Sequence, residues 1–94
     1  MQYIGEEKYY SDGRDFEIYI FRDNNNDELV LESYEIVNGN RKYPLISSHK
    51  VPMNGEWTLE PNEYPEYSEK LAAAKQSIII YTTSQKHIPP GDKK

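Results

Sequence analysis

The sequence contains no cysteine and no long apolar run. Without cysteine the chain forms neither a disulfide framework nor a thiolate metal site, which favours a reducing environment. No uninterrupted apolar stretch is longer than that from Ile78 to Tyr81, which is far short of the roughly 20 residues that span a membrane. Residues Met1 to Lys8 lack the apolar core of a signal peptide. We therefore expect a cytoplasmic protein that does not contact the membrane.

Residues that commonly carry catalysis are also scarce. Histidine occurs only at positions 49 and 87, and no glycine-rich phosphate loop is present. Ser47, Ser48 and His49 are adjacent in an expected strand, so their side chains alternate between faces and cannot form a triad as neighbours. The sequence predicts a protein that is not an enzyme and that holds no cofactor and no metal.

One segment partly matches a calcium-binding loop. Asp23, Asn25 and Asp27 occupy its first three ligand positions. The match then fails, because Glu28 replaces the glycine of the sharp turn and Tyr34 replaces the bidentate glutamate. Asp and Asn are also common in hairpin loops, and we favour that interpretation.

Negative charge is concentrated in the first three-quarters of the chain. The net charge is −5, but residues 1–69 carry fifteen acids and six bases, whereas residues 70–94 carry one acid and five bases. An acidic surface repels nucleic acid and attracts basic surfaces. The expected partner is a protein with a basic surface, such as a nucleic-acid enzyme, and not nucleic acid itself.

The first two-thirds of the chain read as strands separated by turns. Asn38-Gly39 is a preferred type I′ hairpin pair, because both central residues of that turn need positive φ. Asn54-Gly55 repeats this pattern, and Pro44 suggests a sheet edge or a bulge. The expected strands are Phe16–Arg22, Glu28–Val37, Arg41–Val51 and a short Glu56–Leu59, with a further strand from Met1–Ile4 and Lys8–Tyr10.

The last third has helical periodicity. An apolar seam at spacings of three and four comprises Tyr64, Tyr67, Leu71, Ala74, Ile78, Tyr81 and Gln85. Asn62 is a suitable N-cap, and Pro65 suits the first turn. The β-branched run Ile78–Thr83 is compatible with a strand, but no turn residue precedes it, so we favour a helix. The predicted fold is α+β: residues 1–86 form an antiparallel β-meander of four or five strands with one C-terminal helix packed on one face, and residues 87–94 form a flexible tail.

The assumed register assigns side chains to the two faces of the sheet. Pairing Arg22 with Glu28 and Glu35 with Lys42 gives a helix-covered face of Phe16, Ile18, Ile20, Val30, Tyr34, Ile36, Tyr43 and Leu45, with Glu32 as a misfit. The opposite face then holds Tyr19, Phe21, Leu29, Leu31 and Ile46. An exposed apolar patch with a charged rim indicates an interaction surface, unless the segment containing Tyr9 and Tyr10 covers it. A slip of one residue would exchange the faces.

An acidic run precedes and enters the expected helix. It comprises Glu56, Glu60, Glu63, Glu66 and Glu69, with Trp57, Tyr64 and Tyr67 interleaved and no base in residues 56–69. A row of carboxylates can imitate nucleic-acid phosphates, although acids also suit a solvated helix start. The nine tyrosines are equally compatible with an interface and with core filling.

We therefore predict a small acidic protein-binding module that inhibits a partner by occupying its basic, nucleic-acid-binding surface. Similar small, acidic domains occur among phage anti-defence proteins, including anti-CRISPR proteins, and toxin-immunity proteins, but no motif identifies a family. The expected contact residues are Glu56, Trp57, Glu60, Glu63, Tyr64, Glu66, Tyr67, Glu69, Tyr19, Phe21 and Leu31. The alternatives are a structural subunit, such as a homodimer, that associates through the apolar sheet face, and a nucleotide sponge whose tyrosines stack on the ligand. The net charge disfavours the sponge unless Arg41, Lys42 and Lys50 converge.

Overall fold

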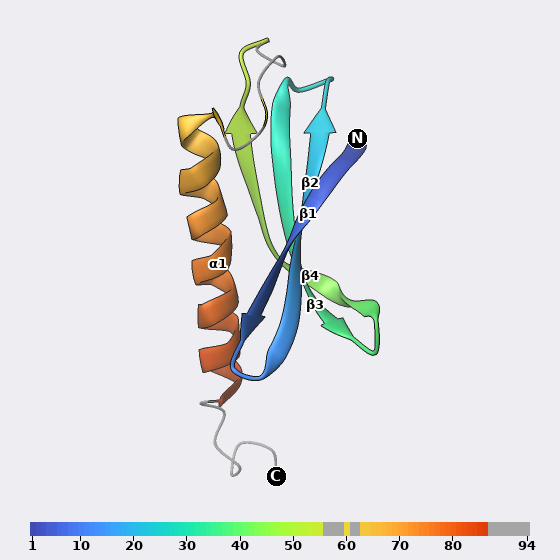
Figure 1. Cartoon of the computed structure of the whole chain (residues 1–94), viewed down its shortest axis with the longest axis vertical. Helices are drawn as coiled ribbons and strands as arrows, with labels where there is room; N and C mark the ends of the chain where they lie inside the picture. Colours follow the sequence, from blue (N-terminus) through green and yellow to red (C-terminus); the bar gives the residue numbers. More distant parts are fainter. Residues whose placement is uncertain (56–59, 61–62, 87–94) are drawn as a thin grey trace.

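The chain folds as a four-stranded antiparallel sheet with one helix against it (Figure 1). The computed structural model describes residues 1–55, 60 and 63–86, except for the side chains of residues 85 and 86. The elements are β1 (Gln2–Ser11), β2 (Arg14–Asp23), β3 (Glu28–Val37), β4 (Asn40–Pro52) and α1 (Pro65–Lys86), and the strand order is β1-β2-β3-β4. The predicted α+β meander is confirmed. The expected strand at Glu56–Leu59, the N-cap Asn62 and the tail at 87–94 lie outside the described residues.

Two-residue turns join β1 to β2 and β3 to β4. Asn38 and Gly39 have φ values of 53° and 80°, and Asp12 and Gly13 have values of 54° and 72°. Positive φ at both central residues is the condition for a type I′ turn, which Asn-Gly and Asp-Gly satisfy well. The Asn38-Gly39 turn was predicted from the sequence. The Asp12-Gly13 turn was missed, although Asp-Gly is an equally strong signal. This turn joins the N-terminal segment to β2 as a full ten-residue edge strand.

The loop between β2 and β3 is one residue shorter than expected. Asp23 pairs with Glu28, so only residues 24–27 form the loop, and Asp27 has a φ of 54°. The Asp23 carboxylate accepts the amide hydrogens of Asn25 at 3.1 Å and Asn26 at 3.2 Å, which satisfies the backbone of the tight turn. The predicted pairing of Arg22 with Glu28 is therefore wrong by one residue. Because side chains alternate along a strand, this slip reverses the faces of β3 relative to β2.

The corrected register changes which residues form the core. Leu29 and Leu31, which we expected on the open face, are 1% and 0% exposed on the same face as Phe16, Ile18 and Ile20. Ile46 also packs against this core. Conversely, the open face carries Val30, Glu32, Tyr34 and Ile36, which the sequence register had placed under the helix. Glu32 is thus no misfit, because it lies on the uncovered side of the sheet.

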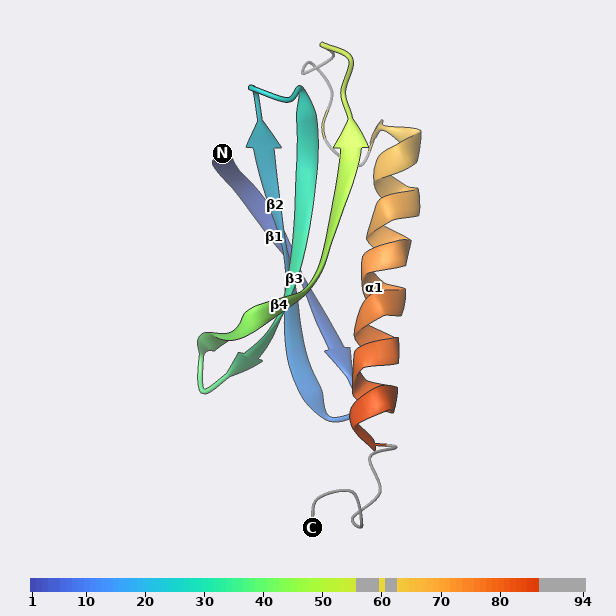
Figure 2. The ribbon, with the colours of Figure 1, turned by 180° about the vertical axis from the view of Figure 1, so that it is seen from behind.

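Strand β4 departs from regular pairing at its centre. Glu35 pairs with Lys42, as predicted, and Ser33 pairs with Ser47, so residues 43–46 all lie opposite Tyr34. Pro44 falls within this irregularity, at the sheet edge, as its missing amide hydrogen requires. The end of the β3–β4 hairpin that contains the Asn38-Gly39 turn bends away from α1 (Figures 1 and 2). Tyr43 is 65% exposed and not beneath the helix, because it lies beside Tyr34 on the side of the sheet that the corrected β2–β3 register leaves open.

The helix covers the apolar face of the sheet. Residues 78–83 are helical, so the interpretation as a helix is confirmed. Within the predicted seam Tyr64, Tyr67, Ala74 and Ile78 are buried, and Leu71 and Tyr81 pack against the core. In the part of the chain that the structure describes, no helix is long and apolar enough to cross a bilayer.

Polar contacts fix α1 to both edge strands. The Lys75 ammonium lies 2.6 Å from the Glu7 carboxylate of β1. The Ser77 hydroxyl lies 3.5 Å from Nε2 of His49 on β4. His49 therefore lies beside the helix, at one end of a contact that bridges two elements. Together these contacts set the position of α1 across the sheet.

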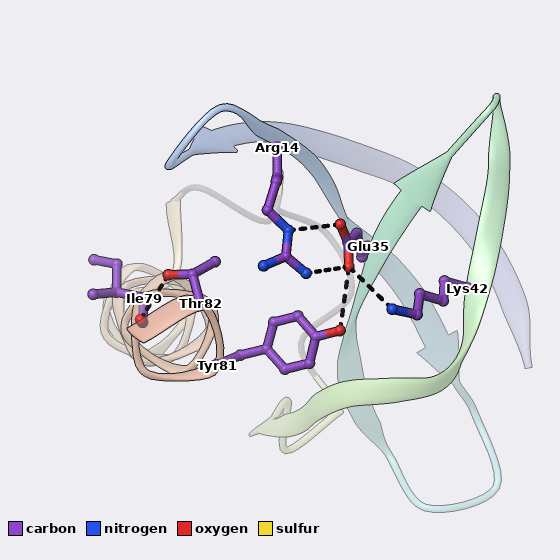
Figure 3. Close-up of polar contacts among 6 residues, drawn as sticks. All are labelled: Arg14, Glu35, Lys42, Ile79, Tyr81 and Thr82. Carbon is purple, nitrogen blue, oxygen red and sulfur yellow. Dashed lines mark hydrogen bonds and ion pairs between the residues drawn. The ribbon is translucent and has the colours of Figure 1, made fainter. Parts of the chain in front are cut away.

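A charged cluster closes the lower end of the helix–sheet interface (Figure 3). Arg14 donates two hydrogen bonds to Glu35, from Nε to Oε2 at 2.8 Å and from Nη2 to Oε1 at 2.7 Å. The Tyr81 hydroxyl donates to the same carboxylate at 3.2 Å, and the Lys42 ammonium lies 3.8 Å away. The Arg14 hydrogen bonds hold the pKa of Glu35 below its ordinary value, although burial acts in the opposite direction. This cluster satisfies a carboxylate that the corrected register places under the helix.

Candidate protein-binding surface

The acidic run keeps its carboxylates at the surface. Glu60, Glu63, Glu66 and Glu69 are exposed, whereas Glu56 lies outside the described residues. Glu63 Oε1 accepts the amide hydrogen of Glu60 at 2.9 Å, and the Glu60 carbonyl accepts the amide hydrogen of Glu63 at 2.9 Å. Within the described ranges no lysine or arginine forms an ion pair with Glu63, Glu66 or Glu69. Their negative charge is therefore exposed to solvent.

The two aromatic residues of this run that the structure describes, Tyr64 and Tyr67, are buried. Tyr64 and Tyr67 are 7% and 6% exposed and belong to the core beneath the helix. Burial raises the pKa of Tyr67, with a smaller contribution from the charge of Glu7. Trp57 lies outside the described residues. Tyr64 and Tyr67 therefore present little surface, because their spacing directs them along the same seam as Ala74 and Ile78; contact between them and a partner stays a prediction.

A second surface gathers tyrosines on the open side of the sheet. We call it the tyrosine face, and it consists of Tyr3, Tyr19, Phe21, Tyr34, Arg41 and Tyr43 with the carboxylates of Glu6, Glu17 and Glu32. Tyr19 and Phe21 are here as predicted, whereas Leu31 is buried on the other side of the sheet. Among the described residues, no helix or strand covers this face. Tyr3 and Tyr43 are 52% and 65% exposed on this face and Tyr19 and Phe21 are half-buried, whereas Tyr34 is only 5% exposed.

The aromatic rings of this face form a continuous row across the four strands. Ring centroids of Tyr3 and Phe21 lie 6.0 Å apart, those of Tyr3 and Tyr19 6.2 Å, those of Tyr19 and Tyr34 5.6 Å, and those of Tyr34 and Tyr43 5.4 Å. Most of these pairs are edge-to-face, the arrangement that the ring quadrupoles favour. The contacts fix the rings in place before any partner arrives.

Each of three tyrosine hydroxyls donates to a carboxylate on the same face. Tyr3 donates to Glu6 at 2.5 Å, Tyr34 donates to Glu32 at 3.1 Å, and Tyr19 donates to Glu17. These bonds stabilise the protonated hydroxyls next to negative charge. Accordingly the pKa of Tyr3 is raised chiefly by its bond to Glu6.

Burial combines with the same hydroxyl bonds at the two inner rings. The pKa values of Tyr19 and Tyr34 are raised first by burial and then by the neighbouring glutamate. The bond from Tyr19 lowers the pKa of Glu17, which remains ionised. Each of these tyrosines therefore forms a hydrogen-bonded pair with its neighbouring glutamate.

Arg41 lies over the centre of the row. Its guanidinium carbon is 5.0 Å from the ring centroid of Tyr19, 5.3 Å from that of Tyr34 and 5.9 Å from that of Tyr43. These distances are within the range of cation–π attraction. The side chain is exposed, so its guanidinium lies at the surface, with three rings on its inner side.

The basic residues proposed for nucleotide binding do not converge. Arg41 lies on the tyrosine face, Lys42 is exposed 3.8 Å from Glu35 on the other side of the sheet, and Lys50 pairs with Glu28 at 3.6 Å. Alternation along β4 places Arg41 and Lys42 on opposite faces of the sheet. The condition set for a nucleotide sponge is therefore not met.

The loop that resembles a calcium site uses its carboxylates internally. Asp23 accepts hydrogen bonds from the amides of Asn25 and Asn26, and Asp27 Oδ2 accepts the amide hydrogen of Gly55 at 2.6 Å. In the described ranges no group of three or more His, Asp or Glu side chains is arranged to hold a metal. The hairpin-loop interpretation accounts for these residues.

Several residues of the tyrosine face were missed from the sequence. Tyr3 and Glu6 reach this face through β1, and the unrecognised Asp12-Gly13 turn would have indicated that pairing. Arg41 and Tyr43 reach it because they share a face with Ile36 and Tyr34, which the corrected β2–β3 register moves to the open side. Searches of known protein families, of curated proteins and of solved structures find no match for this chain.

Proposed function

We propose that this chain is an acidic protein-binding module that docks on a basic, nucleic-acid-binding surface of a partner protein through its tyrosine face. The observation that carries the proposal is the combination, on one uncovered surface, of a fixed row of aromatic rings and three carboxylates. Tyrosine supplies contact area at low entropic cost and tolerates water, as protein interfaces require. Lys8 pairs with Glu6 at 3.6 Å and with Glu17 at 3.0 Å, and the carboxylates that remain beside the rings, with Glu32, favour a cationic partner.

The corrected register also separates the roles of the two acidic regions. The glutamates around the start of α1 lie on the helix side of the sheet, whereas Glu6, Glu17 and Glu32 lie on the opposite side. One flat partner surface cannot contact both regions together. The tyrosine face therefore supplies the short-range contacts, and Glu63, Glu66 and Glu69 add to the long-range field that attracts a basic partner.

A groove next to the tyrosine face offers additional contact area. It has a volume of about 570 Å³, and its polar lining includes Lys8, Tyr10, Asp15 and Glu17. Tyr10 is 69% exposed there. A basic side chain or a short segment of the partner fits such a groove, because two of the lining residues are acidic and only one is basic.

Self-association through this face is less favourable than the sequence suggested. The expected patch contained Leu29, Leu31 and Ile46, but all three pack in or against the core. The observed face carries Glu6, Glu17 and Glu32 instead, and a symmetric pair would bring like charges together. Sedimentation of the wild-type chain and of Phe21→Glu tests this directly, and a wild-type dimer dissociated by the substitution would favour the structural-subunit alternative.

The experiment that tests the proposal is affinity capture from the native host with matched variants. Wild-type chain, Tyr43→Ala and Ile80→Ala are immobilised in parallel. Ile80 is 56% exposed on the outer side of α1, so this variant removes exposed apolar area far from the tyrosine face. We expect wild type and Ile80→Ala to retain the same basic protein and Tyr43→Ala to retain much less.

Elution then tests the mode of binding. Duplex DNA or RNA should release the captured protein by competing for its surface, and so should an increase in salt, because phosphate-type contacts are strongly salt dependent. Glu63→Gln, Glu66→Gln and Glu69→Gln combined should slow association more than they speed dissociation. A captured protein that is indifferent to nucleic acid, to salt and to Tyr43→Ala would overturn the proposal.

A further inference from the structure

The three rings beneath Arg41 form a preorganised site for a planar cation. Tyr19, Tyr34 and Tyr43 lie 5.0, 5.3 and 5.9 Å from one guanidinium carbon. Tyr19 and Tyr34 are hydrogen-bonded to Glu17 and Glu32, and neighbouring rings fix both of them. We call this group the cation cage. Its present occupant belongs to the chain itself.

We propose that the cation cage recognises an arginine side chain of the basic partner, and that Arg41 is a built-in competitor that the partner's arginine displaces. This inference rests on the proposed function and identifies the group that the tyrosine face binds. It makes the face specific for guanidinium and not for positive charge in general. It also makes binding conditional, because Arg41 must leave before the partner's side chain can enter.

The geometry favours guanidinium over ammonium. Guanidinium is planar and weakly hydrated, so it can stack on rings while its edges donate hydrogen bonds to carboxylates. The cage offers both parts: Glu32 accepts from Tyr34 through one oxygen, and Glu17, which accepts from Tyr19 and from Lys8 at 3.0 Å, lies beside the same rings. A donated hydroxyl hydrogen bond also polarises the phenol and strengthens the negative potential of its ring face. A lysine ammonium would use only the charge of this arrangement.

The position of Arg41 makes displacement feasible. The residue is exposed and is two positions after the Asn38-Gly39 turn, on the part of β4 that bends away from α1. Tyr43, the outer wall of the cage, is 65% exposed. The Arg41 side chain can therefore swing into solvent without disturbing the core, whereas the bidentate Arg14–Glu35 pair beneath the helix cannot open in this way.

The first test uses the wild-type chain and a small probe. N-acetyl-arginine methylamide is titrated while nuclear magnetic resonance follows the rings of Tyr19, Tyr34 and Tyr43 and the Nε–Hε group of Arg41. We expect the ring signals and the Arg41 signal to shift together with one dissociation constant, because the probe replaces the side chain. The acetylated citrulline analogue, which is neutral and isosteric, should cause no saturable shift. Ring signals that ignore the arginine probe, or respond equally to citrulline, would overturn the inference.

The second test removes the competitor. Arg41→Gln should bind the arginine probe about tenfold more tightly than wild type, because a tethered side chain competes at a high effective concentration. Lys50→Gln is the matched control: it removes the same charge from the same strand but lies beside Glu28, away from the cage. It should bind the probe as wild type does. Adding Tyr43→Leu to Arg41→Gln should abolish the gain.

The outcomes separate this inference from the proposed function. A dispersed nuclear magnetic resonance spectrum would show that Arg41→Gln is folded. If this folded variant binds the arginine probe no more tightly than wild type, Arg41 does not occupy a ligand site. If Arg41→Gln does not fold, the wild-type titration decides alone. A basic protein captured through Tyr43 together with a failed arginine titration would overturn only the cage. An arginine response without capture of any basic partner would leave the cage and overturn the proposed function.

Discussion

Replacing Arg14 in the Arg14–Glu35 pair should lower the free energy of unfolding more than replacing Glu35. The Glu35 side chain is 9% exposed, whereas that of Arg14 is 26% exposed. Arg14→Met leaves a buried carboxylate with the Tyr81 hydroxyl at 3.2 Å and the Lys42 ammonium at 3.8 Å. Glu35→Gln leaves a guanidinium that can turn towards water. We expect Arg14→Met to lower the free energy of unfolding by about 2–4 kcal/mol and Glu35→Gln by about 1–2 kcal/mol.

The pH dependence follows from the same contacts. Arg14 keeps the pKa of folded Glu35 below its ordinary value, so the stabilisation is present above the unfolded pKa of about 4.3. It is lost as the pH falls through the lower folded-state pKa. Without Arg14, burial of Glu35 is opposed only by the Tyr81 hydrogen bond and the charge of Lys42, so the variant gains less stability from ionised Glu35 as the pH rises. The difference between wild type and Arg14→Met should therefore widen from about pH 3 to about pH 7.

Urea unfolding followed by circular dichroism measures these differences. A double-mutant cycle of Arg14→Met and Glu35→Gln should give a coupling energy of about 1–3 kcal/mol. Lys75→Met is the comparison, because it breaks the Lys75–Glu7 pair, whose side chains are 34% and 38% exposed, and should cost less than about 1 kcal/mol. Equal losses for Arg14→Met and Lys75→Met, or a loss that does not change with pH, would refute this reasoning.

Three further predictions test the register, a turn and the tyrosine face. Leu31→Ala should cost about 2–5 kcal/mol in urea unfolding and Tyr43→Ala about 0.5–1.5 kcal/mol; the reverse order would favour the register expected from the sequence. Gly39→Ala should lower stability by about 1–2 kcal/mol, because φ is +80° although no atom lies within 4 Å of the added Cβ, and a Tm equal to that of wild type would contradict the turn. The pKa values of Tyr3, Tyr19 and Tyr34 are raised, so stability should be complete below about pH 10 and fall as the pH rises further. Ultraviolet titration of the phenolates checks this, and nine tyrosines that ionise together near their ordinary pKa would contradict it.

The sequence predicted the elements better than it predicted their registration. Asn38-Gly39 fixed one hairpin, because a two-residue turn leaves no freedom in the pairing. The stretch Asp23–Asp27 did not fix the other, because several loop lengths suit such a composition. The actual length depends on Asp23 accepting two amide hydrogens and on the positive φ of Asp27. Because the loop is one residue shorter than assumed, Leu31 lies on the helix-covered face and Val30 on the open face, the reverse of the prediction.

A warning of that error was present in the sequence. The assumed register placed Glu32 among apolar side chains, and the corrected one places it beside Tyr34 on the open side. The correction, however, puts Glu35 under the helix, where only a partner distant in the sequence makes it acceptable. Arg14, 21 residues earlier, provides that partner. Periodicity along one strand cannot reveal such compensation, and neither can it reveal that Arg41 meets three rings from different strands.

The contact between Lys75 and Glu7 has a consequence for how the protein is made. The helix residue leaves the ribosome long after the strand residue that it binds, because nearly seventy positions separate them. Until then the leucines and isoleucines of the sheet have no cover, and such a sheet is prone to associate with other chains. Nascent chains released before Lys75 should therefore need a chaperone, whereas chains that extend beyond α1 can close over their own strands.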